Sequence, residues 1–219
     1  MPEIDFFQRF GVFAIKEFLD ADLCNKIQAE QSLSTYVSPA TIVNSEGIER
    51  VDDETRRTKL VEVSKNLKDL VTQHLAGVKP KIAAHFGVAL DECERPQFLA
   101  YKEGDFFKPH TDSSTSPDSH YYLQQRRVSV VIFLNGESAS ADRNSYSGGS
   151  LILYGLIDNP SWKDYGFNIK GEPGLLIAFA SDVYHEVTPV TQGMRFTIVT
   201  WFPSSVPPQF SSAEATETS

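Results

Sequence analysis

The sequence predicts an α+β fold, in which a double-stranded β-helix (jelly roll) of about eight strands carries N-terminal helices on one of its sheets. Two observations lead to this prediction. In the first 96 residues, apolar side chains recur at helical spacing over two segments. From residue 97 onward, short apolar runs alternate with turns, which is typical of a sandwich or barrel.

A chain of 219 residues and 24.4 kDa is expected to form one domain with its own core. Residues 1–96 are predicted to be a strand and helix support region of that domain. Residues 97–202 are predicted to be the jelly-roll catalytic core. Residues 203–219 are rich in Pro, Ser, Thr and Glu, which predicts a flexible tail.

The N-terminal part begins with a predicted strand within residues 10–19. Asp20 is a suitable N-cap for a helix over residues 21–31, because its side chain can accept a hydrogen bond from a free backbone N–H. Residues 38–55 are polar and predict a loop, and residues 56–63 predict a short strand.

A long helical region is predicted to follow Ser64, which would cap it. The apolar residues at helical spacing are Leu67, Leu70, Val71, Leu75, Val78 and Ile82. Pro80 should kink or divide this helix, because proline has no N–H to donate and clashes with the preceding turn. His74 and His85 fall in the same region and are expected to pack on the helix surface.

The eight candidate strands are residues 97–101, 106–109, 127–134, 150–154, 167–169, 175–179, 185–190 and 195–202. Two long polar loops, residues 113–125 and 136–147, interrupt them. Long loops within a compact domain are often functional. We therefore expect the first loop to form part of a substrate rim or a lid.

Charge and composition disfavour several classes of protein. The chain has 20 basic and 29 acidic residues, a net charge of −9, which argues against a nucleic-acid groove over the whole surface. An apolar run long enough to span a membrane and an apolar signal segment are both missing from the sequence, so a cytoplasmic location is expected. Cys24 and Cys93 are expected to be free thiols.

The most informative motif is His110-Thr111-Asp112, which is followed much later by His185. Residues i and i+2 of a strand point to the same face, so His110 and Asp112 can bind one metal while Thr111 faces away. Two histidines and one carboxylate are the ligands of the facial triad, which holds a non-haem Fe(II) and leaves coordination positions open. For the first pair alone, a surface histidine and a turn aspartate are the alternative.

Arg195 begins an apolar strand whose inward face it shares with Thr197, Val199 and Trp201. A cation at the start of such a face is costly to bury without an anion. A guanidinium pairs with a carboxylate through two parallel hydrogen bonds. The partner is therefore expected to be either an acidic side chain or a bound dicarboxylate.

Several features of the second half occur together. They are Tyr101, His110-x-Asp112, residues 127–135, Gly148-Gly149, residues 185–190 and Arg195. This combination resembles the 2-oxoglutarate- and Fe(II)-dependent dioxygenases, and within them the prolyl 4-hydroxylase-like branch. The resemblance extends over about residues 97–202.

The resemblance implies roles for five residues. His110, Asp112 and His185 would ligate iron. Arg195 would pair with the distal carboxylate of 2-oxoglutarate, and Tyr101 would hydrogen-bond the same carboxylate. The resemblance also implies O2 as a cosubstrate and admits ascorbate as a further cofactor.

Other residues near the motifs have less certain roles. Some members of the family supply a second tyrosine hydroxyl at the place of Phe133, which has none. Arg126 and Arg127 are expected to be solvated, with substrate binding as the alternative. Asp182 fits either a loop position or a supporting position near His185.

The implied reaction is hydroxylation of a C–H bond, with succinate and CO2 as coproducts. Halogenating relatives lack the carboxylate ligand, so Asp112 favours hydroxylation. The implied substrate is a prolyl residue in a peptide or protein, and the alternative is a free small molecule such as an amino acid. Nucleic-acid demethylation is disfavoured by the charge. A non-catalytic jelly-roll binding module is the alternative from another class. The sequence specifies no oligomeric state.

Overall fold

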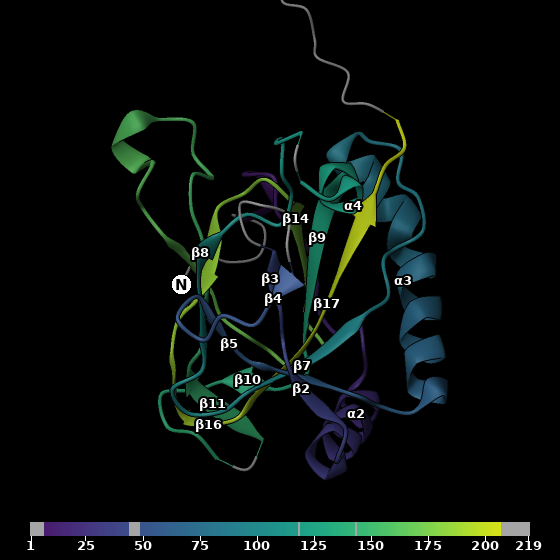
Figure 1. The fold of residues 1–219 in the computed structure, drawn as a ribbon, viewed down its shortest axis with the longest axis vertical. Coiled ribbons are helices and arrows are strands. Elements are labelled where there is room, and N and C mark those ends of the chain that lie inside the picture. The colour runs from purple at the N-terminus through teal and green to yellow at the C-terminus, as the bar shows by residue number, and fades with distance from the viewer. Residues whose placement is uncertain (1–6, 44–48, 118, 143, 207–219) are drawn as a thin grey trace, which may run out of the picture.

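The short apolar runs of the sequence become strands of two large sheets in the computed structural model, which describes residues 7–43, 49–117, 119–142 and 144–206 (Figure 1). The seven-stranded sheet has the order β1 (Phe13–Ile15), β14 (Leu176–Ala180), β9 (Arg126–Phe133), β17 (Arg195–Pro203), β7 (Gln97–Tyr101), β6 (Lys59–Val61) and β2 (Val37–Pro39). The five-stranded sheet has the order β13 (Phe167–Ile169), β12 (Leu151–Leu153), β15 (His185–Val187), β8 (Phe106–His110) and β5 (Arg56–Arg57). Neighbouring strands in both sheets are antiparallel.

Strand β9 shows why its sequence is apolar almost without interruption. Val128, Val130 and Ile132 belong to the core beneath the helices. Val131 and Phe133 point the other way, into a second core that includes residues of the five-stranded sheet. Because β9 is buried on both faces, it lacks the polar alternation of a strand that faces water.

Two helices, α2 (Ala21–Leu33) and α3 (Lys65–Phe86), lie together against one face of the seven-stranded sheet (Figure 1). This arrangement confirms the expected helical layer. The carboxylate of Asp20 accepts a hydrogen bond from the N–H of Leu23 at 2.7 Å, as predicted for the cap of α2. Ser64 occupies the cap position of α3, but its hydroxyl donates to Glu30 of α2 at 3.0 Å and so links the two helices.

The expected division of α3 at Pro80 is wrong. The helix runs unbroken from Lys65 to Phe86 and ends at Gly87, whose φ of +64° suits a glycine. Val78 and Ile82, on either side of the proline, are both buried against the sheet. Their burial holds the two halves of the helix on one surface, while Pro80 itself is exposed.

Several predicted boundaries also change. The loop expected at residues 38–55 contains β3 (Ile42–Val43) and β4 (Glu49–Arg50), and residues 44–48 lie outside the described part. The single strand expected at 56–63 divides between the two sheets at Thr58, which is buried and donates to the carbonyl of Ala100 at 3.1 Å.

The long loops are partly ordered as well. The first contains a short helix, α4 (Tyr121–Gln125), and the second contains β10 (Gly136–Glu137) and the start of β11 (Ser145–Gly148). The strand expected at residues 185–190 ends at β15, and the chain continues as β16 (Val190–Gly193). Strands β10, β11 and β16 form a separate three-stranded sheet.

The architecture is thus rich in strands, with few helices. Closure of the sheets into a jelly roll stays a prediction, as does the division of the chain at residues 96 and 202. Most of the predicted tail, residues 207–219, lies outside the described residues. Among those described, none of the helices is long and apolar enough to cross a membrane. The expected location in the cell stays a prediction.

Helix α2 offers a test of the helical layer. Ile27 is fully buried, whereas Leu33 at the end of the same helix is 82% exposed. Ile27→Ala should lower the free energy of unfolding by about 2–5 kcal/mol, because it leaves a cavity beneath the sheet. Leu33→Ala should change it by less than about 0.5 kcal/mol. Urea unfolding of both variants measures the difference, and equal costs would contradict this packing.

Candidate active site

The expected metal-binding pair lies at the end of β8. His110 is the last residue of the strand, and Asp112 follows it in a bend. The expectation that both residues stand on the strand is therefore wrong. The N–H of Asp112 donates to the carbonyl of Ser181 at 2.9 Å. This hydrogen bond ties the bend to the residue that follows β14 of the seven-stranded sheet. The bend still places the Asp112 carboxylate beside the imidazole of His110.

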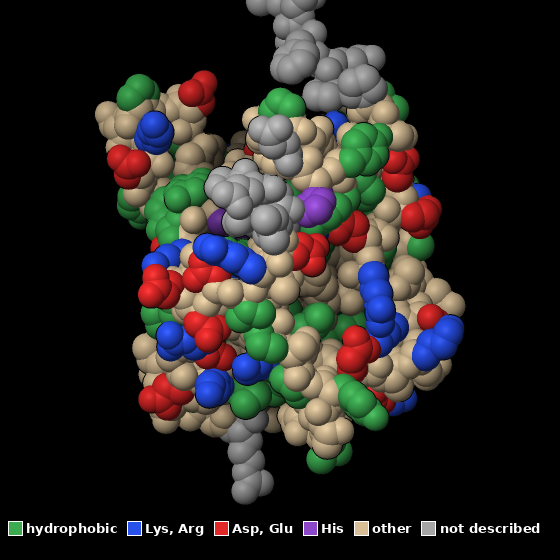
Figure 2. Space-filling model, viewed as in Figure 1, with side chains coloured by type: hydrophobic (Ala, Val, Ile, Leu, Met, Phe, Trp, Pro, Cys, Tyr) green, Lys and Arg blue, Asp and Glu red, His purple; other side chains and the backbone are tan. Residues whose placement is uncertain are grey.

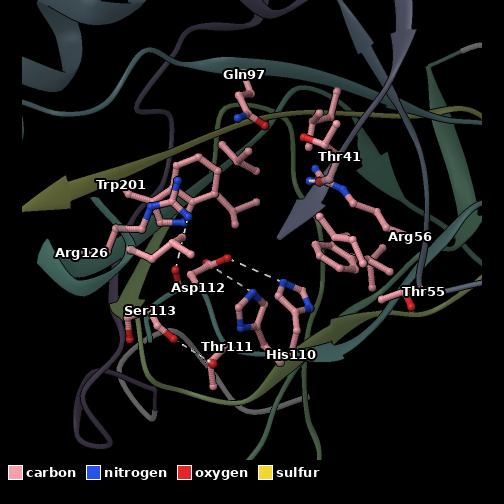
Figure 3. Close-up of a pocket in the computed structure, with 18 of the residues that line it drawn as sticks. Thr41, Thr55, Arg56, Gln97, His110, Thr111, Asp112, Ser113, Arg126 and Trp201 are labelled. Atoms are coloured by element: carbon pink, nitrogen blue, oxygen red, sulfur yellow. Dashed lines mark hydrogen bonds and ion pairs between the residues drawn. The ribbon is translucent and has the colours of Figure 1, made fainter. Parts of the chain in front are cut away.

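The structure brings His110, Asp112 and His185 together. His110 pairs with His185 across strands β8 and β15, and their ring centroids are 4.2 Å apart. The carboxylate oxygens of Asp112 lie 3.6 Å from Nε2 of His110 and 3.5 Å from Nε2 of His185 (Figure 3). One donor atom of each residue lies within 4.8 Å of the other two, which is close enough to hold one metal ion.

Neighbouring groups fix the orientation of all three side chains. Nδ1 of His110 donates to the carbonyl of Lys108 at 2.8 Å, and Nδ1 of His185 donates to that of Val183 at 2.9 Å. Each imidazole therefore presents Nε2 as its free ligand atom. The hydroxyl of Ser129 donates to the Asp112 carboxylate at 2.7 Å.

Arg195 is buried without an acid. It is 1% exposed and faces Tyr101 across the pairing of β17 with β7. Its Nη1 donates to the hydroxyl of Thr197 at 3.3 Å, while Nε has no hydrogen-bond partner. No carboxylate of the described residues forms an ion pair with it. Of the two expected partners, this favours a bound dicarboxylate.

Aromatic rings surround the Arg195 guanidinium. Its central carbon lies 5.0 Å from the ring centre of Tyr101, 5.3 Å from that of Phe133 and 6.0 Å from that of Tyr146. The negative faces of such rings stabilise a desolvated cation, although they do not neutralise it.

Sequence reasoning missed Tyr146. The side chain is fully buried and its hydroxyl has no hydrogen-bond partner in the described part of the chain. Burial raises the pKa of this hydroxyl, against the opposing positive charge of Arg195. Its place two residues before Gly148-Gly149 was the available signal, because Gly149 lies against the side chain of Arg195.

A cavity of about 510 Å³ connects the metal-binding cluster with Arg195. His110, Asp112, His185, Tyr101 and Arg195 all line it. The donor set fits Fe(II): two imidazoles and one carboxylate converge from one side, and the cavity leaves room for further ligands on the other. The unpaired Arg195 fits the far carboxylate of 2-oxoglutarate in the same cavity.

Comparison with known proteins now assigns the family. Residues 96–203 match the family model described as the 2OG-Fe(II) oxygenase superfamily. The chain belongs to this superfamily. Membership implies Fe(II), 2-oxoglutarate and O2 as the metal and cosubstrates.

Two solved structures share the fold over most of this chain's length. The structure of a prolyl 4-hydroxylase from Pseudomonas putida covers 92% of this chain and 97% of its own, with a TM-score of 0.69 and 22% identity. A prolyl hydroxylase from Trichoplax adhaerens, solved with a peptide fragment of hypoxia inducible factor, covers 93% and 94%, with a TM-score of 0.64 and 16% identity. A PKHD-type hydroxylase from Teredinibacter turnerae is 29% identical over 147 residues, 67% of this chain and 58% of the relative. The chain spans about half the length of the first curated relatives it matches.

The expectation that Arg126 is solvated is wrong. Its guanidinium makes two hydrogen bonds of 2.6 Å to the carboxylate of Glu94 and stacks on Trp201 at 3.6 Å. It also donates to the carbonyl of Asp112 at 3.2 Å. Arg127 is half-buried and donates to the carbonyl of Gln124 at 2.7 Å. Arg126 thus belongs to the cavity wall and supports the metal-site backbone.

Other predicted residues lie away from the cavity. His74 and His85 contact Phe18 and Phe13 from α3, as expected of packing residues. Asp182 is exposed, which assigns it to the loop.

The remaining expectations concern the thiols and the paired glycines. Cys24 and Cys93 are free thiols, as predicted. Gly148 and Gly149 both have positive φ, and a side chain on Gly149 would meet Val190 and Arg195 at 3.0 Å or less. The paired glycines therefore lie at the end of β11, where a side chain on Gly149 would not fit.

Burial and charge set the protonation of the site. Burial by itself would raise the pKa of Asp112, but the neighbouring imidazoles and the Ser129 hydroxyl hold that pKa well below its usual range. Burial, together with the nearby His110, lowers the pKa of His185 to about 4. At neutral pH the site therefore presents an ionised carboxylate and a neutral His185, which are the protonation states that a metal requires.

The lowered pKa of His185 predicts how the metal-free protein responds to acid. Between pH 6.5 and about 4 the unfolded chain binds a proton that the folded chain does not, so stability should fall as the pH falls through this window. The loss should be at most about 3 kcal/mol. Asp112 titrates below this window and does not offset it. Urea unfolding in chelator should show a flatter profile for His185→Gln, and parallel profiles would contradict the assignment.

Proposed function

We propose that this chain is an Fe(II)- and 2-oxoglutarate-dependent hydroxylase of a prolyl residue in a peptide or protein, with succinate and CO2 as coproducts. One observation carries the proposal: the His110, Asp112 and His185 donors and the unpaired Arg195 line the same cavity. 2-Oxoglutarate needs both features. The metal would bind its keto acid end, and the unpaired arginine would bind its far carboxylate.

The three donors would hold Fe(II) in a facial arrangement. When bound, the iron supplies the activation of O2 and the oxidative decarboxylation of 2-oxoglutarate. The chain's own contribution is to keep Asp112 ionised and to fix both Nε2 atoms toward one point. The hydrogen bonds to Lys108 and Val183 maintain this geometry before the metal arrives.

Arg195 and Tyr101 would bind the far carboxylate of 2-oxoglutarate. The guanidinium offers a planar fork of donors, and the tyrosine hydroxyl adds a third. Both side chains are almost completely buried, so few waters compete for the carboxylate. Ascorbate is retained only as an accessory reductant.

The division of the chain into regions is also part of the proposal. We propose that residues 97–202 form a jelly-roll catalytic core and that residues 1–96 support it from outside. The family match over residues 96–203 supports the proposed bounds of the core. The helices packed on the seven-stranded sheet support the proposed role of residues 1–96. The segment after residue 202 is proposed as a tail outside the core.

Two observations support a peptide or protein substrate. The neighbours in solved structures are prolyl hydroxylases, and the Trichoplax adhaerens protein was solved with a peptide fragment. On the face in Figure 2, acidic and basic side chains are interspersed, which does not favour nucleic acid. The second candidate is a free amino acid, because a cavity of about 510 Å³ must hold the cosubstrate as well as the reacting group.

Anaerobic titration with Fe(II) and 2-oxoglutarate tests the cofactor site. The wild-type chain should develop the weak visible charge-transfer band of the chelate, and His185→Ala should not. His74→Ala, on the outer surface of α3, is the matched control and should keep the band. A missing band in the folded wild type would favour a non-catalytic binding module instead.

Ser129 supplies a second test. Its hydroxyl donates to Asp112 at 2.7 Å and lies 3.0 Å from the hydroxyl of Ser181. Ser129→Ala frees one carboxylate oxygen and should weaken metal affinity by roughly 10- to 100-fold. Ser147→Ala removes another buried hydroxyl, which among the described residues donates to the carbonyl of Ser138, so affinity should not change. Competition titration with Co(II) measures both, and equal affinities would refute the role of Ser129.

A further inference from the structure

A second buried guanidinium lines the cavity. Arg56, on β5, is 8% exposed and lies over the ring of Phe107 at 4.6 Å. The Phe107 ring stacks in turn on the imidazole of His110, with 3.5 Å between ring centres. Figure 3 shows Arg56 across the cavity from Arg126 and Trp201. Arg56 is therefore one aromatic ring away from the metal-binding cluster.

Arg56 lacks an anionic partner. Its Nη1 donates to the carbonyl of Thr41 at 3.0 Å, while Nε is buried without an acceptor. No acid in the described residues forms an ion pair with it. Glu49 also lines the cavity, but its carboxylate accepts the hydroxyl of Tyr122 at 2.9 Å. Among the described residues, Arg56 is thus left without an ion-pair partner.

The other cations at the cavity already have anionic partners. Arg126 is neutralised by Glu94, whose carboxylate accepts two hydrogen bonds from the guanidinium. In the proposed cofactor complex, the positive charges of Fe(II) and Arg195 are balanced by Asp112 and the two carboxylates of 2-oxoglutarate. When the cofactor site is full, Arg56 is the cation that remains on the substrate side.

We propose that Arg56 binds a carboxylate of the substrate. This inference rests on the proposed hydroxylase function and narrows its substrate class to molecules that carry an acidic group beside the reacting carbon. A neutral carbonyl would satisfy a hydrogen bond but would leave a buried charge, which is costly. A carboxylate satisfies both needs, and the guanidinium fork matches its geometry.

Two sources can supply this carboxylate. One is an acidic side chain next to proline in a peptide, and the other is the α-carboxylate of a free amino acid. Four probes separate them: acetyl-Glu-Pro-Glu amide, acetyl-Gln-Pro-Gln amide, free L-proline and L-prolinamide. Within each pair the two probes have nearly the same shape, and amides replace carboxylates: two in the peptide pair and one in the proline pair.

The experiment measures the affinity of each probe for the Fe(II)·2-oxoglutarate complex of the full chain under anaerobic conditions, from the perturbation of the chelate band. In wild type, at least one carboxylate probe should bind about 10- to 100-fold more tightly than its amide counterpart. Preference in the peptide pair identifies a side-chain acid, and preference in the proline pair identifies an α-carboxylate.

Variants at Arg56 test the residue itself. Arg56→Gln should abolish the preference for the carboxylate, and Arg56→Lys should retain part of it, because a point charge replaces the fork. Arg57→Gln is the matched control: this neighbouring arginine is exposed and lies over Phe106 on the other face of the strand pair. The control should keep the full preference.

The outcomes separate this inference from the proposed function. A normal chelate band with no carboxylate preference in either pair, or a preference that survives Arg56→Gln, overturns the role of Arg56 and leaves the cofactor site standing. Absence of the chelate band in wild type overturns the proposed function itself. If the chelate band is lost only in Arg56→Gln, the decision rests on Arg56→Lys. That variant must then show a reduced preference for the carboxylate probe if the inference holds.

Discussion

The antiparallel pairing of β8 with β15 is the constraint on which the site depends. It sets His110 opposite His185, with the ring centres 4.2 Å apart. A slip of one residue in this register would turn one imidazole to the opposite face of the sheet. Strand β12 on one side and β5 on the other hold the pair in place. Through β5, the same sheet also carries Arg56 to the cavity.

The seven-stranded sheet provides the opposite wall. Arg195 begins β17, a central strand between β7 and β9, and it pairs with Tyr101 of β7. Phe179 of β14 contacts the ring of His185 edge-on at 4.8 Å, across the gap between the sheets. The apolar core between the sheets therefore sets how the metal donors face Arg195. Stability and cofactor geometry depend on the same packing.

Local patterns in the sequence predicted the helices, most strands and the grouping of the site residues. What they missed depends on contacts between distant segments. Asp112 leaves the strand because Ser181 accepts its N–H, and Arg126 is buried because Glu94 lies beside it. Neither partner is visible in the sequence around these residues. Pro80 follows the same logic, since burial on both sides of it outweighs its local preference.

Two aromatic rings from different elements, Phe133 and Tyr146, pack around the Arg195 guanidinium. Phe133 offers no hydroxyl at the place where some relatives have tyrosine, and its ring packs beside Arg195 instead. Tyr146 approaches Arg195 from β11, in the small three-stranded sheet. A side chain on Gly171 would lie 2.3 Å from the Tyr146 hydroxyl and 2.8 Å from the Phe133 ring. The two aromatic rings therefore require glycine at 171, and they tie the small sheet to the pocket of Arg195.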